Sequence, residues 1–386
     1  MKKISISDSV RYIGCDDKTL DLFENQYVIP NGVSYNSYVI IDEKIAVMDT
    51  ADERVSEEWF KNLENALDGR KPDYLVVSHL EPDHSGNIGT AMKKYPEMTM
   101  VCSAKAQGML GQFFTDDFSG RILAVKEGDT LSLGSHTLHF VMAPMVHWPE
   151  VMVEYEDSEK ILFSADGFGK FGTLDTDEEW DCEARRYYFN IVGKYGAPVQ
   201  TLLKKAAALE IKTICPLHGP VLTGDLSHYL ELYNTWSSYK PERSGVFIAY
   251  ASLHGNTAKA AEKLKALLES RGVTVAISDL SREDLAEAVE DAFKYDRMVC
   301  ASSTYDGGIF TPMADLITRL KSKTYQNRKV AFIENGSWAP MAAKLMKAEF
   351  EGMKNITFAD TTVTVKTALN SSSEAALEAL ADELSK

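Results

Sequence analysis

The sequence has no long apolar run: nothing in it approaches the ~18–20 consecutive apolar residues that a membrane-spanning helix needs. Its N-terminal stretch "MKKISISDSVRYIGC" contains two lysines but no apolar segment behind them. A secretory signal peptide requires such a segment. We therefore expect neither a membrane span nor a signal peptide.

Cysteine is scarce and scattered. The sequence has five cysteines, none in a C-x-x-C pair, at Cys15, Cys102, Cys182, Cys215 and Cys300. The odd number and the scatter argue against a disulfide framework and are typical of a reduced, cytoplasmic protein. They also exclude a thiolate-bound zinc or iron knuckle within this sequence.

Positive charge is also in short supply, with 41 lysines and arginines against 57 acidic residues and a net charge of −16. This balance argues against nucleic acid or an anionic membrane as a partner, and it is compatible with soluble redox partners. A length of 386 residues is too great for one ordinary hydrophobic core and indicates two domains.

The first part of the sequence reads as strands joined by loops that carry histidines and carboxylates. "SYNSYVIID" and "KIAVMDT" predict a hairpin closed at Asp42–Glu43, and "KPDYLVVSH" predicts a strand that ends on His79. Further strands are predicted at "TMVCSA", "HTLHFVMAP", "EVMVEYE" and "KILFSAD". Helical periodicity is found at 53–67, 87–95, 181–194 and 198–209.

The pattern changes at "SSYKPERSGV", a polar joint with a proline, and we place the domain boundary there, giving domains 1–243 and 244–386. Strands then alternate with helices. The strands are expected at 245–251, 273–279, 297–303, 329–334 and 357–365, and the helices at 257–270, 282–293, 312–322, 340–352 and 372–385. This alternation predicts an α/β domain with a doubly wound parallel sheet.

Four residues that can bind a metal stand together in "SHLEPDHSGN": His79, Glu81, Asp83 and His84. A loop that leaves a strand end can direct such neighbours to two sides, so one short segment can serve two metal ions. A single structural zinc would need four ligands and usually prefers thiolate, and no cysteine is near this loop. A purely structural polar loop is disfavoured because four packed ionisable groups are costly unless they are paired or metal-bound.

Three more candidate ligands follow predicted strands: His147 in "APMVHWPE", Asp166 at the end of "KILFSAD" and His218 in "ICPLHGP". Four imidazoles and three carboxylates suit two metals that share one bridging carboxylate. The remaining histidines of this region, His136, His139 and His228, are expected on a strand or a helix face, and we assign them no role.

The H-x-E-x-D-H cluster, followed by His, Asp and His at strand ends, resembles the metallo-β-lactamase fold, a sandwich of two β-sheets flanked by helices. Hydrolases of that family have histidine at the position of Glu81, and the carboxylate resembles the diiron branch. A carboxylate is a harder, anionic ligand that favours iron, whereas imidazole-rich sets suit zinc. The resemblance implies one iron at His79, Glu81 and His147 and another at Asp83, His84 and His218, with Asp166 bridging.

A second constellation follows the strand "VFIAYA", where "SLHGNT" leads into a predicted helix. Hydroxyls and backbone N–H groups around a helix N-terminus form a seat for a phosphate, here offered by Ser252, His254, Gly255, Asn256 and Thr257. The Walker A lysine and the G-x-G-x-x-G pattern are both missing, which disfavours a triphosphatase and a dinucleotide fold.

Two further loops leave neighbouring strands and define the same crevice. They supply Ser303, Thr304, Tyr305, Asp306, Gly307 and Gly308 from "SSTYDGG", and Asn335, Gly336, Ser337 and Trp338 from "ENGSWAP". Tyr305 and Trp338 either cover the faces of a planar ring or pack against neighbours. This half resembles flavodoxin, which implies FMN. The loop "NGSWAP" is shorter than in relatives, so either Trp338 or only the backbone of 335–338 contacts the flavin ring.

Together, the two halves resemble the flavodiiron proteins over essentially the whole chain. The resemblance implies reduction of O₂ to water, of NO to N₂O, or both, at a diiron site fed by FMN, with no catalytic residues beyond the metal ligands. It also implies a head-to-tail homodimer or dimer of dimers and, since the C-x-x-C pairs of an appended rubredoxin are missing, an external electron donor such as rubredoxin. Asp49 is a candidate for orienting a histidine ligand.

Two rival functions stay open at this point. One is a lactamase-fold zinc hydrolase acting on a thioester or lactone, with a flavodoxin-like accessory domain. The other is an electron carrier whose metal site is vestigial. The sequence also leaves open the choice between O₂ and NO, the donor, and dimer against tetramer.

Overall fold

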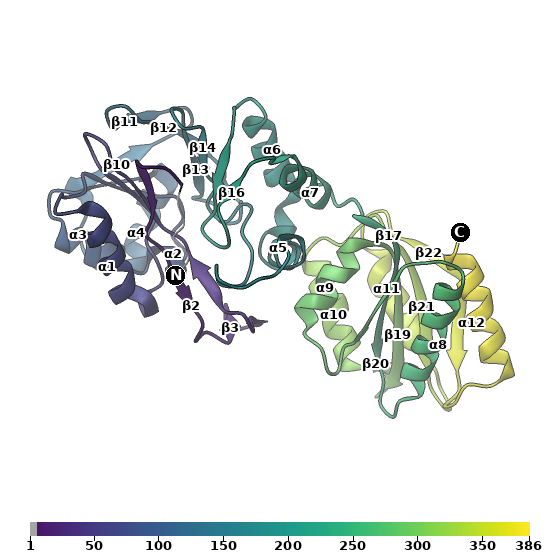
Figure 1. The fold of residues 1–386 in the computed structure, drawn as a ribbon. Helices are drawn as coiled ribbons and strands as arrows, with labels where there is room; N and C mark the ends of the chain where they lie inside the picture. Colours follow the sequence, from purple (N-terminus) through teal and green to yellow (C-terminus); the bar gives the residue numbers. More distant parts are fainter. Residues whose placement is uncertain (1–5) are drawn as a thin grey trace. The chain divides into compact units, whose positions relative to one another are not determined.

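The computed structural model describes residues 6–386 as two compact units (Figure 1). The first runs up to Tyr188 and includes Ala197–Asn234, and the second comprises Phe189–Gly196 and Thr235–Lys386. The segment 189–196 belongs to the second unit because its side chains pack there: Phe189 stacks on Phe293 with ring centroids 4.1 Å apart. The predicted boundary at 243 thus lies inside the second unit, eight residues after Thr235.

The first unit contains two six-stranded sheets. The first sheet has the order β1 (Val10–Tyr12), β6 (Tyr38–Ile40), β7 (Ala46–Met48), β8 (Tyr74–Val77), β9 (Thr99–Ser103) and β10 (Ile122–Val125). The second has the order β11 (Thr130–Ser132), β12 (Thr137–Met142), β13 (Met152–Glu156), β14 (Ile161–Phe163), β15 (Thr213–Cys215) and β16 (Leu222–Thr223). The predicted hairpin is the antiparallel pair β6–β7.

One hydrophobic core joins these sheets. Val76 and Val101 of the first sheet and Phe140 and Met152 of the second belong to the same fully buried cluster. Burial on the shared face explains the alternating apolar pattern of the strands. Two small ribbons lie outside the sheets and pair β2 (Cys15–Asp17) with β5 (Val33–Tyr35), and β3 (Leu22–Phe23) with β4 (Tyr27–Val28).

Helices cover the outer faces of this sandwich (Figure 1). In α1 (Ser56–Leu67) the buried residues Trp59, Leu63 and Leu67 recur every four residues, as expected for an amphipathic helix on a sheet. The other helices are α2 (Pro82–Ser85), α3 (Ile88–Lys94), α4 (Ala104–Phe113), α5 (Trp180–Tyr187), α6 (Gly196–Ala206) and α7 (Ser227–Ser237), with short turns η1 (Glu53–Val55), η2 (Ser119–Arg121), η3 (Tyr188–Val192) and η4 (Gly193–Tyr195). Helix α4 was not predicted, and the helix predicted at 181–194 continues beyond α5 as a π-helix and a 3₁₀ turn.

The second unit is a parallel sheet of order β18-β17-β19-β21-β22, the doubly wound order of flavodoxin-like folds. Its elements are β17 (Arg243–Ala251), α8 (Asn256–Ser270), β18 (Val275–Asp279), α9 (Leu285–Lys294), β19 (Tyr295–Tyr305), β20 (Gly308–Ile309), α10 (Thr311–Ser322), β21 (Lys329–Asn335), α11 (Ala342–Glu351), β22 (Thr357–Val365) and α12 (Ser371–Leu384). The predicted fold class is confirmed, with each of the ten predicted elements shifted by a few residues at most.

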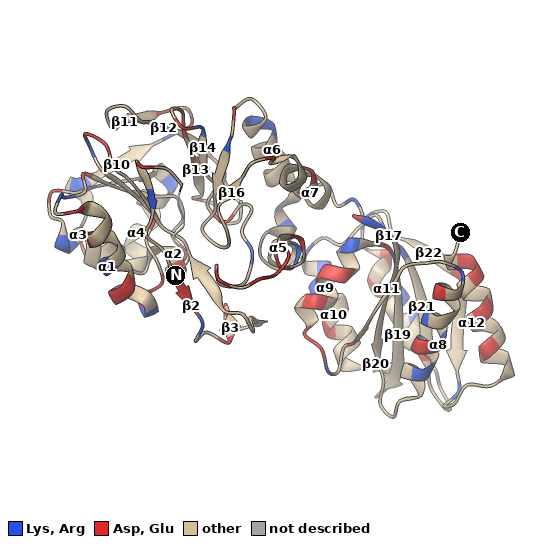
Figure 2. Cartoon of the chain, viewed as in Figure 1, with Lys and Arg blue, Asp and Glu red and all other residues tan. Residues whose placement is uncertain are grey.

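Acidic residues are prominent on α9 and α12 (Figure 2). No helix in the described part of the chain is long and apolar enough to cross a bilayer.

Candidate metal centre and phosphate crevice

The seven predicted ligands come together at the ends of strands from both sheets. They form two groups in which the potential ligand atoms lie within 4.8 Å of one another: His79, Glu81, His147 and Asp166, and Asp83, His84 and His218. Strand β8 ends two residues before His79, and the single helical turn α2, which has Pro82 at its first position, carries Asp83 and His84. Asp166 and His218 each follow a strand of the second sheet, β14 and β15, by three residues.

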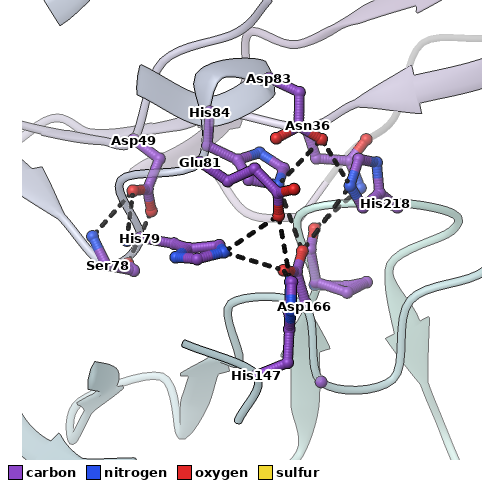
Figure 3. A network of polar contacts seen from close by, with 12 residues as sticks. Asn36, Asp49, Ser78, His79, Glu81, Asp83, His84, His147, Asp166 and His218 are labelled. Atoms are coloured by element: carbon purple, nitrogen blue, oxygen red, sulfur yellow. Dashed lines mark hydrogen bonds and ion pairs between the residues drawn. The ribbon is translucent and has the colours of Figure 1, made fainter. Parts of the chain in front are cut away.

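Asp166 lies between the two groups and presents one oxygen to each (Figure 3). Its Oδ2 is 3.1 Å from Nε2 of His147 and 3.5 Å from Nε2 of His79. Its Oδ1 is 3.2 Å from Nε2 of His84 and 3.6 Å from Nε2 of His218. This is the arrangement of a carboxylate that bridges two cations.

Each group is completed by a second carboxylate. Oε2 of Glu81 lies 3.0 Å from Nε2 of His147 and 3.2 Å from Nε2 of His79. In the other group, Oδ2 of Asp83 lies 3.2 Å from Nε2 of His218 and 3.4 Å from Nε2 of His84. Both groups therefore combine two imidazoles with one carboxylate and a share of Asp166.

The arrangement of the potential ligand atoms suits metal ions better than it suits hydrogen bonds among these atoms. Several buried atoms of this cluster have no hydrogen-bond partner among the described residues: both carboxylate oxygens of Asp83 and of Asp166, both ring nitrogens of His84, and Nε2 of His147 and of His218. Buried polar atoms without partners are costly, and their convergence on one point is explained by cations held between them. Imidazole and carboxylate donors suit iron or zinc.

The histidines and carboxylates of the cluster also shift one another's pKa values. Burial alone would lower the pKa of His84, but the negative charges of Asp83 and Asp166 outweigh it and raise that pKa to about 9. The pKa of His147 also rises to about 9, because its close contacts with the carboxylates of Asp166 and Glu81 outweigh its burial. Metal binding displaces these protons, so affinity for the metal falls as the pH is lowered.

Glu150 orients one ligand, and the sequence had not identified it. Burial opposes its charge, yet the contact with His79 lowers the pKa of Glu150. Its Oε1 accepts a hydrogen bond from Nδ1 of His79 at 2.7 Å and from the backbone N–H of Leu80 at 3.0 Å. Nδ1 of His218 similarly donates to the carbonyl of Ser34 at 2.7 Å. The signal for Glu150 was its place three residues after His147, just before a strand.

Asp49, the predicted orienting residue, acts on backbone instead of on an imidazole. Its Oδ1 accepts from the N–H of Ser78 at 2.8 Å and from the N–H of His79 at 3.4 Å, and its Oδ2 accepts from the hydroxyl of Ser78 at 2.6 Å. It therefore fixes the loop at the end of β8, whereas the ring of His79 is held by Glu150.

A cavity of about 370 Å³ with a mixed polar and apolar wall is lined by the ligands Glu81 and Asp83 among others. Glu24, in the turn between β3 and β4, also lines it. Burial and then the negative charge of Glu81 raise the pKa of Glu24 to about 7. Asp52 and Arg54 add two more charged groups to this mouth, and Leu20, Leu22 and Phe23 make part of its wall apolar.

In the second unit, a cavity of about 290 Å³ lies at the carboxyl ends of the parallel strands, where the predicted phosphate loop enters α8. Gly255 has a φ of +84° immediately before α8, a conformation that glycine adopts without strain. The hydroxyls of Thr257 and Ser303 are 3.0 Å apart in its wall. The lining comprises Ser252, Leu253, His254, Asn256, Thr257, Ser303, Thr304, Asn335, Gly336, Ser337, Trp338 and Thr367.

This lining includes Leu253 and Thr367, which had not been predicted, and it does not include Gly255 or the segment Tyr305–Gly308. Trp338 is 92% exposed and Tyr305 is 48% exposed. The ring of Trp338 is therefore free of packing and lines the cavity, whereas Tyr305 lies outside the lining and its ring contacts Phe310, with ring centroids 5.7 Å apart.

The remaining histidines of the first unit each pair with carboxylates away from the centre. His136 contacts Asp42 and Glu159, and His139 contacts Asp157. His228, in α7, contacts Asp181. Such pairs are sufficient to account for these side chains as structural groups.

Comparison with known proteins gives two family matches: an ODP family beta lactamase over residues 33–219 and a flavodoxin domain over residues 247–363. A nitric oxide reductase of Moorella thermoacetica is 29% identical over 362 residues, covering 91% of this chain and 90% of that protein. Rubredoxin oxygen:oxidoreductase from the anaerobe Desulfovibrio gigas has a similar structure, with a TM-score of 0.91 and 26% identity over 99% of this chain and 97% of that one. The flavodiiron protein from Giardia intestinalis gives a TM-score of 0.90 and 25% identity over 100% of this chain and 96% of that one.

Proposed function

Because this chain belongs to the flavodiiron protein family, we propose that it is an oxidoreductase that reduces dioxygen to water, nitric oxide to nitrous oxide, or both. One relative is named a nitric oxide reductase and a structural neighbour is named a rubredoxin oxygen:oxidoreductase, which supports both gases as substrates.

The observation that carries the proposal is the position of Asp166, whose two carboxylate oxygens face two separate sets of ligands. A bridge of this kind holds two metal ions close enough to act on one substrate. Glu81 supports iron in preference to zinc, since it places an anionic oxygen where an imidazole would favour zinc. We assign one iron to His79, Glu81 and His147 and the other to Asp83, His84 and His218.

The second unit supports FMN as the source of electrons. The hydroxyls of Ser252 and Thr257 and the N–H groups at the start of α8 suit the phosphate. Ser303, Thr304 and residues 335–338 line the same cavity, where the ring would lie. When bound, two ferrous irons and one reduced FMN supply the four electrons with which O₂ and four protons give two waters, or the two with which two NO and two protons give N₂O and water.

The protein's own side chains orient the metal ligands and can transfer protons. The buried histidines hold their Nε2 atoms toward the centre because Glu150 and the Ser34 carbonyl fix the opposite nitrogens of His79 and His218. Glu24 lines the mouth of the site together with Glu81, where its carboxyl group can exchange protons between solvent and the centre.

Electrons have to reach the flavin from outside, and we propose a soluble donor such as rubredoxin. We also propose a head-to-tail homodimer, alone or paired into a tetramer, in which the flavin of one chain serves the irons of the next. The exposed rings of Tyr305 and Trp338 at the crevice are compatible with either contact.

Anaerobic reconstitution with Fe²⁺ and FMN tests the function. We expect two irons and one FMN per chain, and rapid reoxidation of the fully reduced protein on mixing with O₂, NO or both. Asp166→Asn should abolish gas reduction, while Asp360→Asn, an exposed position on β22, should not. Reduced wild-type protein that reacts with neither gas would refute the proposal, and two zincs with thioester or lactone hydrolysis would establish the hydrolase.

A further inference from the structure

An enclosed apolar cavity lies behind the loops that carry two of the metal ligands. Its volume is about 20 Å³, and its walls include Val146, Val153, Leu162, Val199, Leu203 and Tyr233. The hydroxyl of Ser164, which lines the wall, already has a hydrogen-bond partner: it donates to the carbonyl of Gly167 at 2.6 Å. The Tyr233 hydroxyl likewise accepts from the N–H of Phe168.

A cavity of this kind suits a small apolar molecule better than water. It has room for about one small molecule, but an internal water needs two to four polar partners, and the wall offers side chains that are apolar or already hydrogen-bonded. Dissolved O₂ and NO form no strong hydrogen bonds and lose nothing by entering such a space.

Two residues of the cavity wall are chain neighbours of metal ligands. Val146 directly precedes His147 in the chain, and Gly167 directly follows Asp166. The cavity wall therefore includes the direct chain neighbours of two ligands, one of which is the bridging carboxylate.

The outer end adjoins a surface groove of about 380 Å³ between the segment Met142–Pro144 and helix α6. The half-buried Leu202 of α6 lines both the groove and the cavity, so its side chain forms the partition between them. The groove is also mostly apolar, with Ala197 and Pro198 in its wall. The mouth of the centre differs in that its wall adds the charged Glu24, Asp52 and Arg54 to apolar residues such as Leu22 and Phe23.

We propose that this cavity is a docking site for the gaseous substrate, which enters past Leu202, while water and protons use the charged mouth. The identity of the gas, O₂ or NO, rests on the proposed function; the site itself rests on the cavity. Separate entries keep the apolar substrate out of competition with water for the same opening.

Dissolved O₂ is a direct probe, since it is paramagnetic and shortens the relaxation times of nearby methyl protons. We would use the full-length chain with FMN and with Zn²⁺ in the metal centre, which does not react with O₂, and label the Val and Leu methyl groups. The methyl groups of Val146, Val153 and Leu162 should show at least about threefold greater enhancement than those of Val76 and Leu138, which are equally buried in the sheet core. Equal enhancement at the two sets would overturn the proposal.

Variants that fill the cavity provide a second test of the proposal. Val199→Ile adds one methylene to the wall and should remove the enhancement. If that variant folds poorly, Ala206→Val, at the end of α6, should also remove the enhancement. Val275→Ile, in the edge strand β18, is the matched control. Enhancement that persists in both filled variants would refute the assignment.

The iron-loaded enzyme separates this inference from the proposed function. Val199→Ile should lower kcat/KM for O₂ or NO about threefold or more, with kcat at saturating gas little changed. Enhancement in the zinc-loaded chain without gas reduction by the iron-loaded chain would uphold the cavity and refute the function. Gas reduction by the iron-loaded chain without enhancement in the zinc-loaded chain would uphold the function and refute the cavity. Comparing the reactions with O₂ and with NO identifies the gas.

Discussion

Oε1 of Glu150 lies 2.7 Å from Nδ1 of His79, and both side chains are fully buried. Because Nδ1 donates its proton to Glu150, Nε2 of the same ring is left free to bind a metal. A carboxylate outside the ligand set thus decides which nitrogen His79 presents to the centre.

Glu150→Ala should therefore weaken iron binding by about 10–100-fold, because the ring of His79 loses both its orientation and the negative charge behind it. Competition with a chelator of known affinity measures the change. Glu97→Ala, at an exposed position, is the control. Unchanged affinity in Glu150→Ala would show that packing alone orients the ring.

Asp166 and Asp83 should differ in how many metals their loss affects. Asp166→Asn removes an oxygen ligand from both groups, so we expect both irons to be lost or to bind at least about tenfold more weakly. Asp83→Asn affects only the group of His84 and His218 and should leave about one iron per chain. Iron analysis and Mössbauer spectroscopy distinguish the two results, and equal losses would contradict the bridging role.

Asn36 supports the loop that carries His218. Its side-chain amide donates to the carbonyls of Pro216 at 2.8 Å and Gly219 at 2.7 Å, and its carbonyl accepts from the hydroxyl of Tyr12 at 3.0 Å. Asn36→Ala leaves those carbonyls buried without that donor and should cost about 1–3 kcal/mol of stability. Chemical unfolding measures this cost, with Asn65→Ala on the exposed face of α1 as the control. A loss no larger than that of the control would contradict the role.

Thr257→Val should weaken FMN binding without changing the iron content. The hydroxyl of Thr257 stands in the wall of the crevice beside that of Ser303, where it can donate to a phosphate oxygen. A hydrogen bond to a charged group contributes about 1.5–3 kcal/mol, so we expect roughly a 10–100-fold loss of affinity. Titration of the FMN-free protein measures it, and Thr318→Val, exposed on α10, should bind FMN normally.

Stability should depend on pH through His136 and Asp42. Burial opposes both charges, but hydrogen bonds between these groups and to Glu159 raise the pKa of His136, and hydrogen bonds from His136 lower the pKa of Asp42 from 3.8 to about 2. Since the folded-state pKa of the histidine is raised, its stabilisation is complete below its ordinary 6.5 and is lost as the pH rises. The stabilisation by Asp42 is complete above 3.8 and is lost as the pH falls toward 2.

The difference in Tm between the wild type and His136→Gln should thus be larger at pH 5 than at pH 8. Thermal unfolding at both values measures it, and the comparison with the variant cancels groups that titrate in both proteins. A difference that is the same at the two values would show that His136 is not charged in the folded chain.

The fold class and the candidate ligands can be read from local patterns in the sequence. Parallel strands followed by helices bury both faces of a sheet, so the second unit reads as near-continuous apolar strands from 245 onward. Ligands at strand ends are also local information: His79, Asp166 and His218 each follow an apolar strand in the sequence, and the fold brings those strand ends together.

The contacts between individual atoms of the site depend on tertiary packing. The role of Glu150 depends on a contact between residues 71 positions apart, and the split of Asp166 between two groups depends on the packing of two sheets. The apolar cavity is formed by side chains from β13, β14, α6 and α7, whose apolar character the sequence shows but whose imperfect packing it does not. Periodicity specifies which face of an element is buried; the distances between buried groups follow from how all the elements pack at once.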